Sequence, residues 1–162
     1  QITDIAEKNK ALIYKNNNNI FFIFAPIKTK TFRNEKKAYA LSEKINSLLN
    51  NHNKHFNKKI DFGISLNFGE IIASFKENNF KFMTIGSLLP KSKKIADVSS
   101  KEVLLSEEFK DKINEQAKTE KIEGKGIVVY KVKELKNREN YSKFLNEFVK
   151  RQSNSRTSLD KK

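Results

Sequence analysis

Hydrophobic positions recur along this chain with two different periods, which predict helices alternating with strands. From Asn34 onward an apolar residue stands at every third or fourth position, a spacing typical of a long amphipathic helix. The stripe consists of Ala38, Leu41, Ile45, Leu48 and Leu49. Residues 60–68 alternate with a period of two, which predicts a strand. The polar segment 50–59, with His52 and His55, is predicted to be a solvated loop rather than a metal site.

Two hairpins are predicted from pairs of apolar runs that asparagines separate. Residues 11–14 and 20–24 flank Asn16 to Asn19, and asparagine tolerates the positive φ angles of tight turns. Residues 71–75 and 80–85 flank a second asparagine turn. With the strand before them, these two segments are predicted to form a three-stranded antiparallel meander.

The second half of the chain predicts shorter elements. A helix over 88–98 precedes a strand at 103–105. Ser106, followed by two glutamates, predicts a helix start, because a hydroxyl accepts free backbone N–H groups and acids suit the positive end of a helix. Two more strands are predicted over 118–124 and 127–133. Together the elements indicate an α/β domain of the α+β kind, with a mostly antiparallel sheet flanked by helices.

The pattern divides the chain into three parts. Residues 1–135 are predicted to form the domain, and 136–152 a C-terminal amphipathic helix that packs on it or on a partner. The stripe of that helix consists of Tyr141, Phe144, Leu145 and Phe148. Residues 153–162 are polar and are predicted to be a disordered tail.

Composition narrows the class of protein. The formal net charge of +14 favours acidic partners, but the lysines are spread along the whole chain rather than gathered on one element. No cysteine, no signal peptide and no apolar run near the ~20 residues of a membrane span are present, so we expect a cytoplasmic protein. The chain starts at Gln1 and its one methionine is Met83, so we expect it to be a piece of a longer protein.

Four segments resemble, in order, the catalytic domain of class III adenylyl and guanylyl cyclases. Residues 62–73, 82–86, 104–109 and 125–132 look like that family's strand–turn–strand, its strand ending in Ile-Gly, its strand followed by acids, and its final strand. The hairpin and helix before them extend the resemblance back to about residue 5. The resemblance implies the ferredoxin-like cyclase fold for residues 1–135, without the family's first strand, which is central in its sheet.

The resemblance also implies which groups would hold metal. Family members use two carboxylates to bind two divalent cations at the triphosphate. The first carboxylate belongs to the missing first strand. The second position falls on Asn17-Asn18, and the neutral amide of Asn18 is a poorer ligand for a hard cation. We therefore expect no metal and no other cofactor, with Mg²⁺ or Mn²⁺ entering only if residual cyclase activity exists.

The nucleotide contacts of the family have changed as well. By resemblance, Ser87 replaces the aspartate that selects the base, Pro90 the asparagine that orients the ribose, and Lys94 the arginine on the phosphates. Lysine keeps the charge but loses the bidentate fork. No catalytic residue is expected. Lys94 and Lys81, near the family's base-recognising lysine, are the candidate nucleotide-binding residues; Lys91 and Lys93 complete a small basic cluster.

These expectations lead to a non-catalytic signalling module that forms a homodimer or heterodimer with another cyclase-like domain, with a vestigial site for a nucleoside triphosphate. One alternative is a cyclase subunit that makes cAMP or cGMP only with a partner chain. Another alternative is a basic nucleic-acid-binding domain, to which the dispersed lysines give less weight.

Overall fold

The computed structural model describes residues 1–136 except 77–78, 85 and 125. The first half of the chain forms α1 (Ile2–Lys8), β1 (Leu12–Asn16), β2 (Asn19–Ile23), α2 (Pro26–Thr29) and α3 (Glu35–His55). The second half forms β3 (Ile64–Leu66), β4 (Ile71–Lys76), β5 (Asn79–Thr84), α4 (Leu88–Val98), β6 (Val103–Leu105), α5 (Glu107–Ile113), β7 (Ala117–Gly124) and β8 (Ile127–Leu135). No helix in these described residues is both long enough and apolar enough to cross a bilayer.

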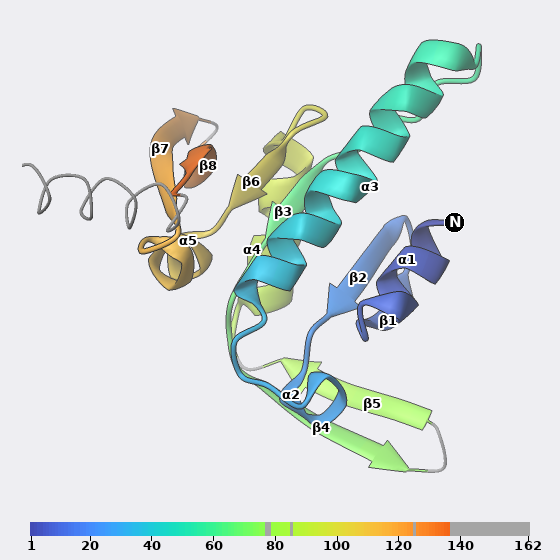
Figure 1. The fold of residues 1–162 in the computed structure, drawn as a ribbon, viewed down its shortest axis with the longest axis vertical. Helices are drawn as coiled ribbons and strands as arrows, with labels where there is room; N and C mark the ends of the chain where they lie inside the picture. The colour runs from blue at the N-terminus through green and yellow to red at the C-terminus, as the bar shows by residue number, and fades with distance from the viewer. Residues whose placement is uncertain (77–78, 85, 125, 137–162) are drawn as a thin grey trace, which may run out of the picture.

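The strands form one four-stranded sheet and two hairpins. The sheet has the order β3-β6-β8-β7, in which β3 and β6 are parallel and the other pairs antiparallel. The hairpins β1–β2 and β4–β5 are antiparallel. The predicted α/β class, with mostly antiparallel pairing and flanking helices, is confirmed (Figure 1).

Helices cover both faces of the four-stranded sheet. Helix α3 passes in front of β3 and also contacts β6, whereas α4 lies behind these strands (Figure 1). Successive residues of β6 therefore enter different clusters, because side chains alternate between the faces of a strand. Val103 and Leu105 pack with Phe109 of α5, whereas Leu104 packs with Ile95 of α4.

The hairpin β1–β2 packs on α1 and α3. Ala6, Ala11, Leu41 and Ile45 form the buried centre of this cluster, and residues of β1 and β2 surround it. Ile64 of β3 contacts both this cluster and the core beneath α5, so β3 joins the two halves of the molecule.

The predicted meander over 60–85 is wrong. Only 64–66 of the predicted strand 60–68 is a strand, and it pairs in parallel with β6 rather than with β4. The carbonyls of Phe62 and Leu66 accept hydrogen bonds from Lys101 and Ser106, which flank β6. A period of two reports that a segment is extended, but it does not identify a partner that lies about forty residues further along the chain.

The predicted loop 50–59 is partly helical, because α3 continues to His55. Polar side chains find partners that support this extension. Asn50 donates to Asn46 Oδ1 at 2.8 Å, and the Asn53 amide exchanges two 2.7 Å hydrogen bonds with the backbone of Ile60. These hydrogen bonds stabilise the last turns of α3, which lack an apolar stripe. The hydrophobic periodicity therefore predicted a helix end that is too early.

Other sequence predictions hold. The Asn16 to Asn19 turn, α4 and β6 lie where they were expected. Ser106 caps α5 by accepting a hydrogen bond from the backbone N–H of Phe109 at 3.3 Å. The predicted helix 136–152, apart from its first residue, and the tail 153–162 lie outside the described residues.

Within the described residues, β2 and β3 each pair on one side only. β2 pairs with β1, and β3 pairs with β6. Since the carbonyls of Phe62 and Leu66 point toward β6, the backbone groups of Gly63 and Ser65 point to the opposite edge, because successive residues alternate. The described residues thus leave one backbone edge of β2 and one of β3 without a strand partner among them.

Candidate nucleotide site

The turn of the β1–β2 hairpin is the position that the resemblance aligns with a metal-binding carboxylate. Asn17 adopts φ 52°, in the left-handed region that asparagine tolerates better than most residues. Asn18 follows it and is exposed. This turn supplies amide groups and no carboxylate, so it fits Mg²⁺ or Mn²⁺ poorly.

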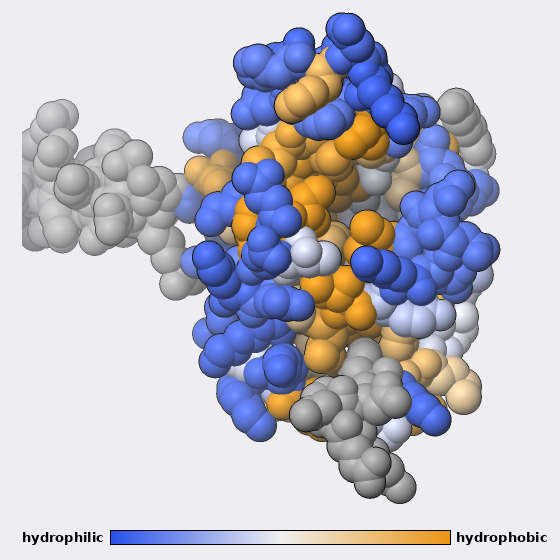
Figure 2. Space-filling view, turned by 90° about the vertical axis from the view of Figure 1, so that its right-hand side faces the viewer, coloured by the Kyte–Doolittle hydropathy of each residue, from blue (hydrophilic) through white to orange (hydrophobic). Residues whose placement is uncertain are grey.

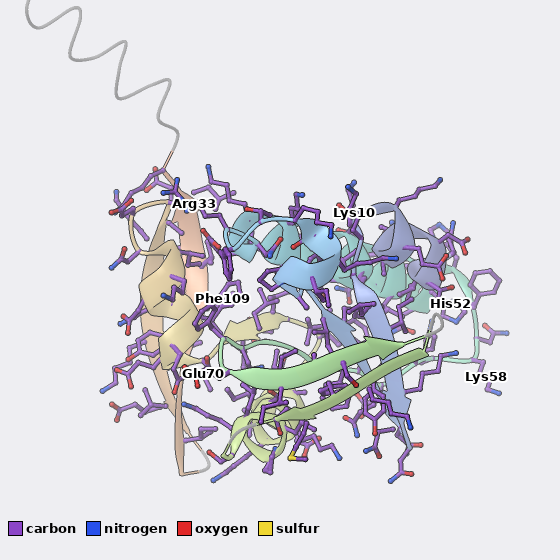
Figure 3. The ribbon with its side chains drawn as sticks, turned by 90° about the horizontal axis from the view of Figure 1, so that it is seen from below. Lys10, Arg33, His52, Lys58, Glu70 and Phe109 are labelled. Carbon is purple, nitrogen blue, oxygen red and sulfur yellow. The ribbon has the colours of Figure 1, made fainter. Side chains whose placement is uncertain are left out.

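Lys81 lies on β5, near the first hairpin. The rings of Tyr14 and Phe82 meet edge to face with centroids 4.9 Å apart, which brings β1 against β5. Lys81 precedes Phe82 and therefore points to the other face of β5, away from that contact. Its side chain is exposed to solvent. Figure 3 shows β5, the strand that carries it, crossing the lower part of the molecule.

Helix α4 carries the remaining positions. Ser87 is its N-cap residue, but the Ser87 side chain makes no capping hydrogen bond. Pro90 lies in the first turn, where its missing N–H costs nothing, and it is exposed. Neither residue presents an amide or a carboxylate at these positions.

The lysines of the basic cluster on α4 differ in their contacts. Lys91 forms an ion pair with Glu108 of α5 at 2.6 Å, and this hydrogen bond lowers the pKa of Glu108 below its usual range. Lys94 is exposed, with its Nζ 3.5 Å from the carbonyl oxygen of Gly126. The structure therefore commits Lys91 to an internal contact and leaves the charge of Lys94 facing solvent.

Two contacts fix α4 on the sheet. The hydroxyl of Ser65 in β3 donates to the carbonyl of Ser92 at 2.9 Å. Gly63 lies so close to α4 that a Cβ there would be 1.9 Å from the carbonyl oxygen of Ala96. These contacts place α4 directly against β3 and the residue before it.

The two histidines make local contacts. The Nε2 atom of His52 lies 3.2 Å from the carbonyl oxygen of Lys58, and its ring stacks on Phe56 at 4.6 Å. The Nδ1 atom of His55 lies 2.8 Å from the carbonyl oxygen of Asn51. No group of three or more His, Cys, Asp or Glu residues suited to a metal ion occurs in the part of the chain that the structure describes.

Sequence reasoning missed a polar pocket between α3, β6 and β8. It has a volume of about 460 Å³ and is lined by Tyr39, Glu43, Asn46, Lys101, Glu102, Val103, Lys131 and Val132. Burial, reinforced by Glu43, raises the pKa of Tyr39 to about 12. Lys131 and Glu102 form an ion pair in this pocket. Its residues come from distant segments without a motif, so no local pattern marks it.

The solved structures to which this chain is similar include several guanylyl cyclase domains. The chain is similar to the guanylyl cyclase Cya2, with TM-score 0.64, 14% identity and coverage of 84% of this chain and 76% of that one. It is similar to the guanylate cyclase domain of RhGC from Catenaria anguillulae in complex with GTP, with TM-score 0.62, 16% identity and coverage of 83% and 79%. It is also similar to a dimeric guanylyl cyclase domain of the RhoGC fusion protein from Blastocladiella emersonii, with TM-score 0.63, 15% identity and coverage of 83% of this chain and 78% of that one. No family model and no curated protein matches the sequence.

The fold is therefore that of nucleotidyl cyclase catalytic domains, as the resemblance of the four sequence segments implied. The chain has this fold, and at the positions that the resemblance aligns with metal and nucleotide contacts it carries Asn18, Ser87, Pro90 and Lys94. Identities of 14–16% show the fold and leave the activity to be argued from the residues.

Proposed function

We propose that this domain does not turn over nucleoside triphosphates by itself and acts by pairing with a second cyclase-like domain. The observation that carries the proposal is the side-chain set at the aligned positions. Asn18 offers no carboxylate for a metal, and Pro90 offers no polar group for a ribose. Losing one preorganised group typically lowers a rate by about 10²–10³-fold, and here several are absent together.

Pairing is supported by apolar surface that the described chain does not cover. Ile72 and Met83 are cross-strand partners on β4 and β5, with exposed fractions of 62% and 67%. An apolar band also runs between hydrophilic flanks on the side of the molecule that carries α1 and the two hairpins (Figure 2). Apolar surface of this extent on a folded domain is typical of a protein–protein interface.

Vestigial nucleotide binding would use exposed lysines that form no ion pair with another described residue and can contact a triphosphate. Lys81 and Lys94 are both exposed, and neither forms an ion pair with another described residue. An ammonium group attracts a triphosphate as a point charge but does not orient it as a guanidinium does. We therefore expect weak, base-tolerant binding that does not require a divalent metal.

The test is nucleotide turnover together with oligomeric state. The chain is incubated with ATP or GTP and with Mg²⁺ or Mn²⁺, and cyclic nucleotide is measured. Sedimentation velocity then reports dimerisation. We expect a concentration-dependent dimer and no cyclic nucleotide. Turnover by the unaltered homodimer would contradict the proposal, and a chain that stays monomeric alone and with cyclase-like partners would contradict its second half.

Matched variants separate pairing from nucleotide binding. Met83→Ser should weaken the dimer while leaving nucleotide affinity unchanged. Lys94→Ala should lower triphosphate affinity several-fold, whereas Lys44→Ala, on an exposed position of α3, should not. If both alanine variants bind the triphosphate like the unaltered chain, α4 carries no nucleotide site.

A further inference from the structure

The segment 27–37, which runs from α2 into the first turn of α3, concentrates positive charge that the other described residues do not neutralise. It holds five cations and one carboxylate, Glu35. The cations are Lys28, Lys30, Arg33, Lys36 and Lys37, and all five are exposed. None of them forms an ion pair with another described residue, whereas Lys91 and Lys131 do. We refer to 27–37 as the basic segment.

Buried hydrogen bonds hold the basic segment in one shape. The side-chain amide of Asn34 donates to the hydroxyl of Thr29 at 3.0 Å and to the carbonyl of Thr31 at 2.7 Å. The Thr29 hydroxyl lies 3.1 Å from the carbonyl oxygen of Ala25. Thr29 and Asn34 are buried although they are polar, so these bonds form the interior of the turn. Because these hydrogen bonds hold the backbone of the turn in place, the exposed side chains of the basic segment project from an ordered turn.

Two large apolar side chains stand among these cations. Phe32 is 86% exposed, the largest value among the exposed large hydrophobic residues that the structure describes. Ile27 is 51% exposed. Figure 3 shows Arg33, which follows Phe32, at the outer edge of the molecule beside α3. A held turn that exposes an aromatic and an aliphatic side chain among five cations of one short segment matches a surface that is apolar inside and anionic outside.

We propose that the basic segment docks on an anionic lipid bilayer, with Phe32 and Ile27 entering the headgroup region and the five cations meeting lipid phosphates and carboxylates. Lysine and arginine side chains near such a surface are attracted to its anionic headgroups, and buried apolar side chains add to this attraction. The positive end of α3 begins in the same segment and repels Lys36 and Lys37, so an anionic surface would relieve that repulsion. This inference is independent of nucleotide binding and of pairing.

A nucleic acid is the competing polyanion, and the geometry favours it less. A nucleic-acid footprint follows an extended groove or element, whereas the five cations of the basic segment lie within eleven consecutive residues that also expose Phe32 and Ile27. A compact basic patch around an apolar wedge is instead the form of interfacial membrane anchors.

The absence of tryptophan from the chain permits a specific reporter. Phe32→Trp places a single indole in the basic segment, and Phe56→Trp places one at the far end of α3, where the native Phe56 is 57% exposed. Both variants are titrated with phosphatidylcholine vesicles that contain a minority of phosphatidylserine, and with pure phosphatidylcholine vesicles. We expect a blue shift of emission for the indole at position 32 with the anionic vesicles only, and none for the indole at position 56.

Charge reversal tests the electrostatic half of the inference. Lys28→Glu/Arg33→Glu should lower affinity for the anionic vesicles by about tenfold or more in cosedimentation. Lys58→Glu/Lys59→Glu makes the same change in net charge beyond the C-terminal end of α3 and should lower it much less. Circular dichroism confirms that each variant is folded.

Three results would overturn the inference. One is no blue shift at position 32, and another is an equal loss of affinity from both charge-reversed pairs. The third is quenching of the same indole by single-stranded RNA while anionic vesicles leave it unchanged, which would assign the basic segment to stacking on bases.

Discussion

The central strand of the sheet half, β6, and the two hairpins of the other half bury their side chains to very different degrees. All three residues of β6 are buried, because α4 covers one face of the four-stranded sheet, and α3 and α5 cover the other. The hairpins β1–β2 and β4–β5 have one covered face, and Ile20, Ile72 and Met83 are exposed by half or more. The difference teaches that the centre of the sheet half contributes much of the stability of the monomer, whereas the hairpins keep apolar surface for contacts beyond it.

Truncating the centre of the sheet half should have the largest effect. Leu105 has no exposed surface, and Leu105→Ala should lower the free energy of unfolding by about 2–5 kcal/mol, since it removes burial and leaves a cavity. Ile72→Ala, on an exposed position of β4, should lower it by less than about 1 kcal/mol. Urea denaturation followed by circular dichroism measures both. Equal losses would remove the distinction between the halves.

Adding one carbon where β3 meets α4 should have the next largest effect. In Gly63→Ala the new Cβ would lie 1.9 Å from the backbone oxygen of Ala96 and 2.6 Å from that of Ser99, so helix or strand must move. Overpacking of this kind typically costs about 1–3 kcal/mol. Gly124→Ala, at the end of β7, meets no atom within 4 Å and serves as the control. Unchanged stability of Gly63→Ala would show that α4 is not fixed to β3.

The same contrast explains what the sequence alone could predict. Elements with their own local signal were found, such as the α3 stripe and the Ser106 cap. The partner of β3 was not found, because a strand covered on both faces is defined by elements distant in sequence. At the candidate site, the sequence identified Asn18, Pro90 and Lys94 through a resemblance. It could not predict that Lys91 binds Glu108, since the two residues lie on different helices.

Removing the helix cap should have a moderate effect. The Ser106 hydroxyl accepts a hydrogen bond from the backbone N–H of Phe109, so Ser106→Ala leaves that N–H without its partner at a cost of about 1 kcal/mol. Ser87 begins α4 without a capping hydrogen bond from its side chain, and Ser87→Ala should change stability by a few tenths of a kcal/mol at most. Thermal denaturation of the two variants measures the difference. Equal melting temperatures would show that the Ser106 hydrogen bond contributes nothing.

The ion pair between α4 and α5 should have the smallest effect and a distinctive pH dependence. The hydrogen bond from Lys91 lowers the pKa of Glu108, so the folded state binds a proton there more weakly than the unfolded state does. The stabilisation is therefore present above the unfolded pKa of about 4.3 and is lost as pH falls through the folded value. Both side chains are partly exposed, so solvent screening limits the contribution to less than about 1 kcal/mol.

Lys91→Met removes this pair, and Lys93→Met on the same helix is its control. At neutral pH, Lys91→Met should be the less stable variant in urea denaturation, and added salt should reduce its deficit because screening weakens the pair already in the unaltered chain. The deficit should also shrink as pH falls below about 4, where protonation of Glu108 removes the pair from the unaltered chain too. A deficit that persists unchanged in acid would assign the role of Lys91 to the packing of its methylenes on α5, and α4 would then be held to α5 by apolar contact alone.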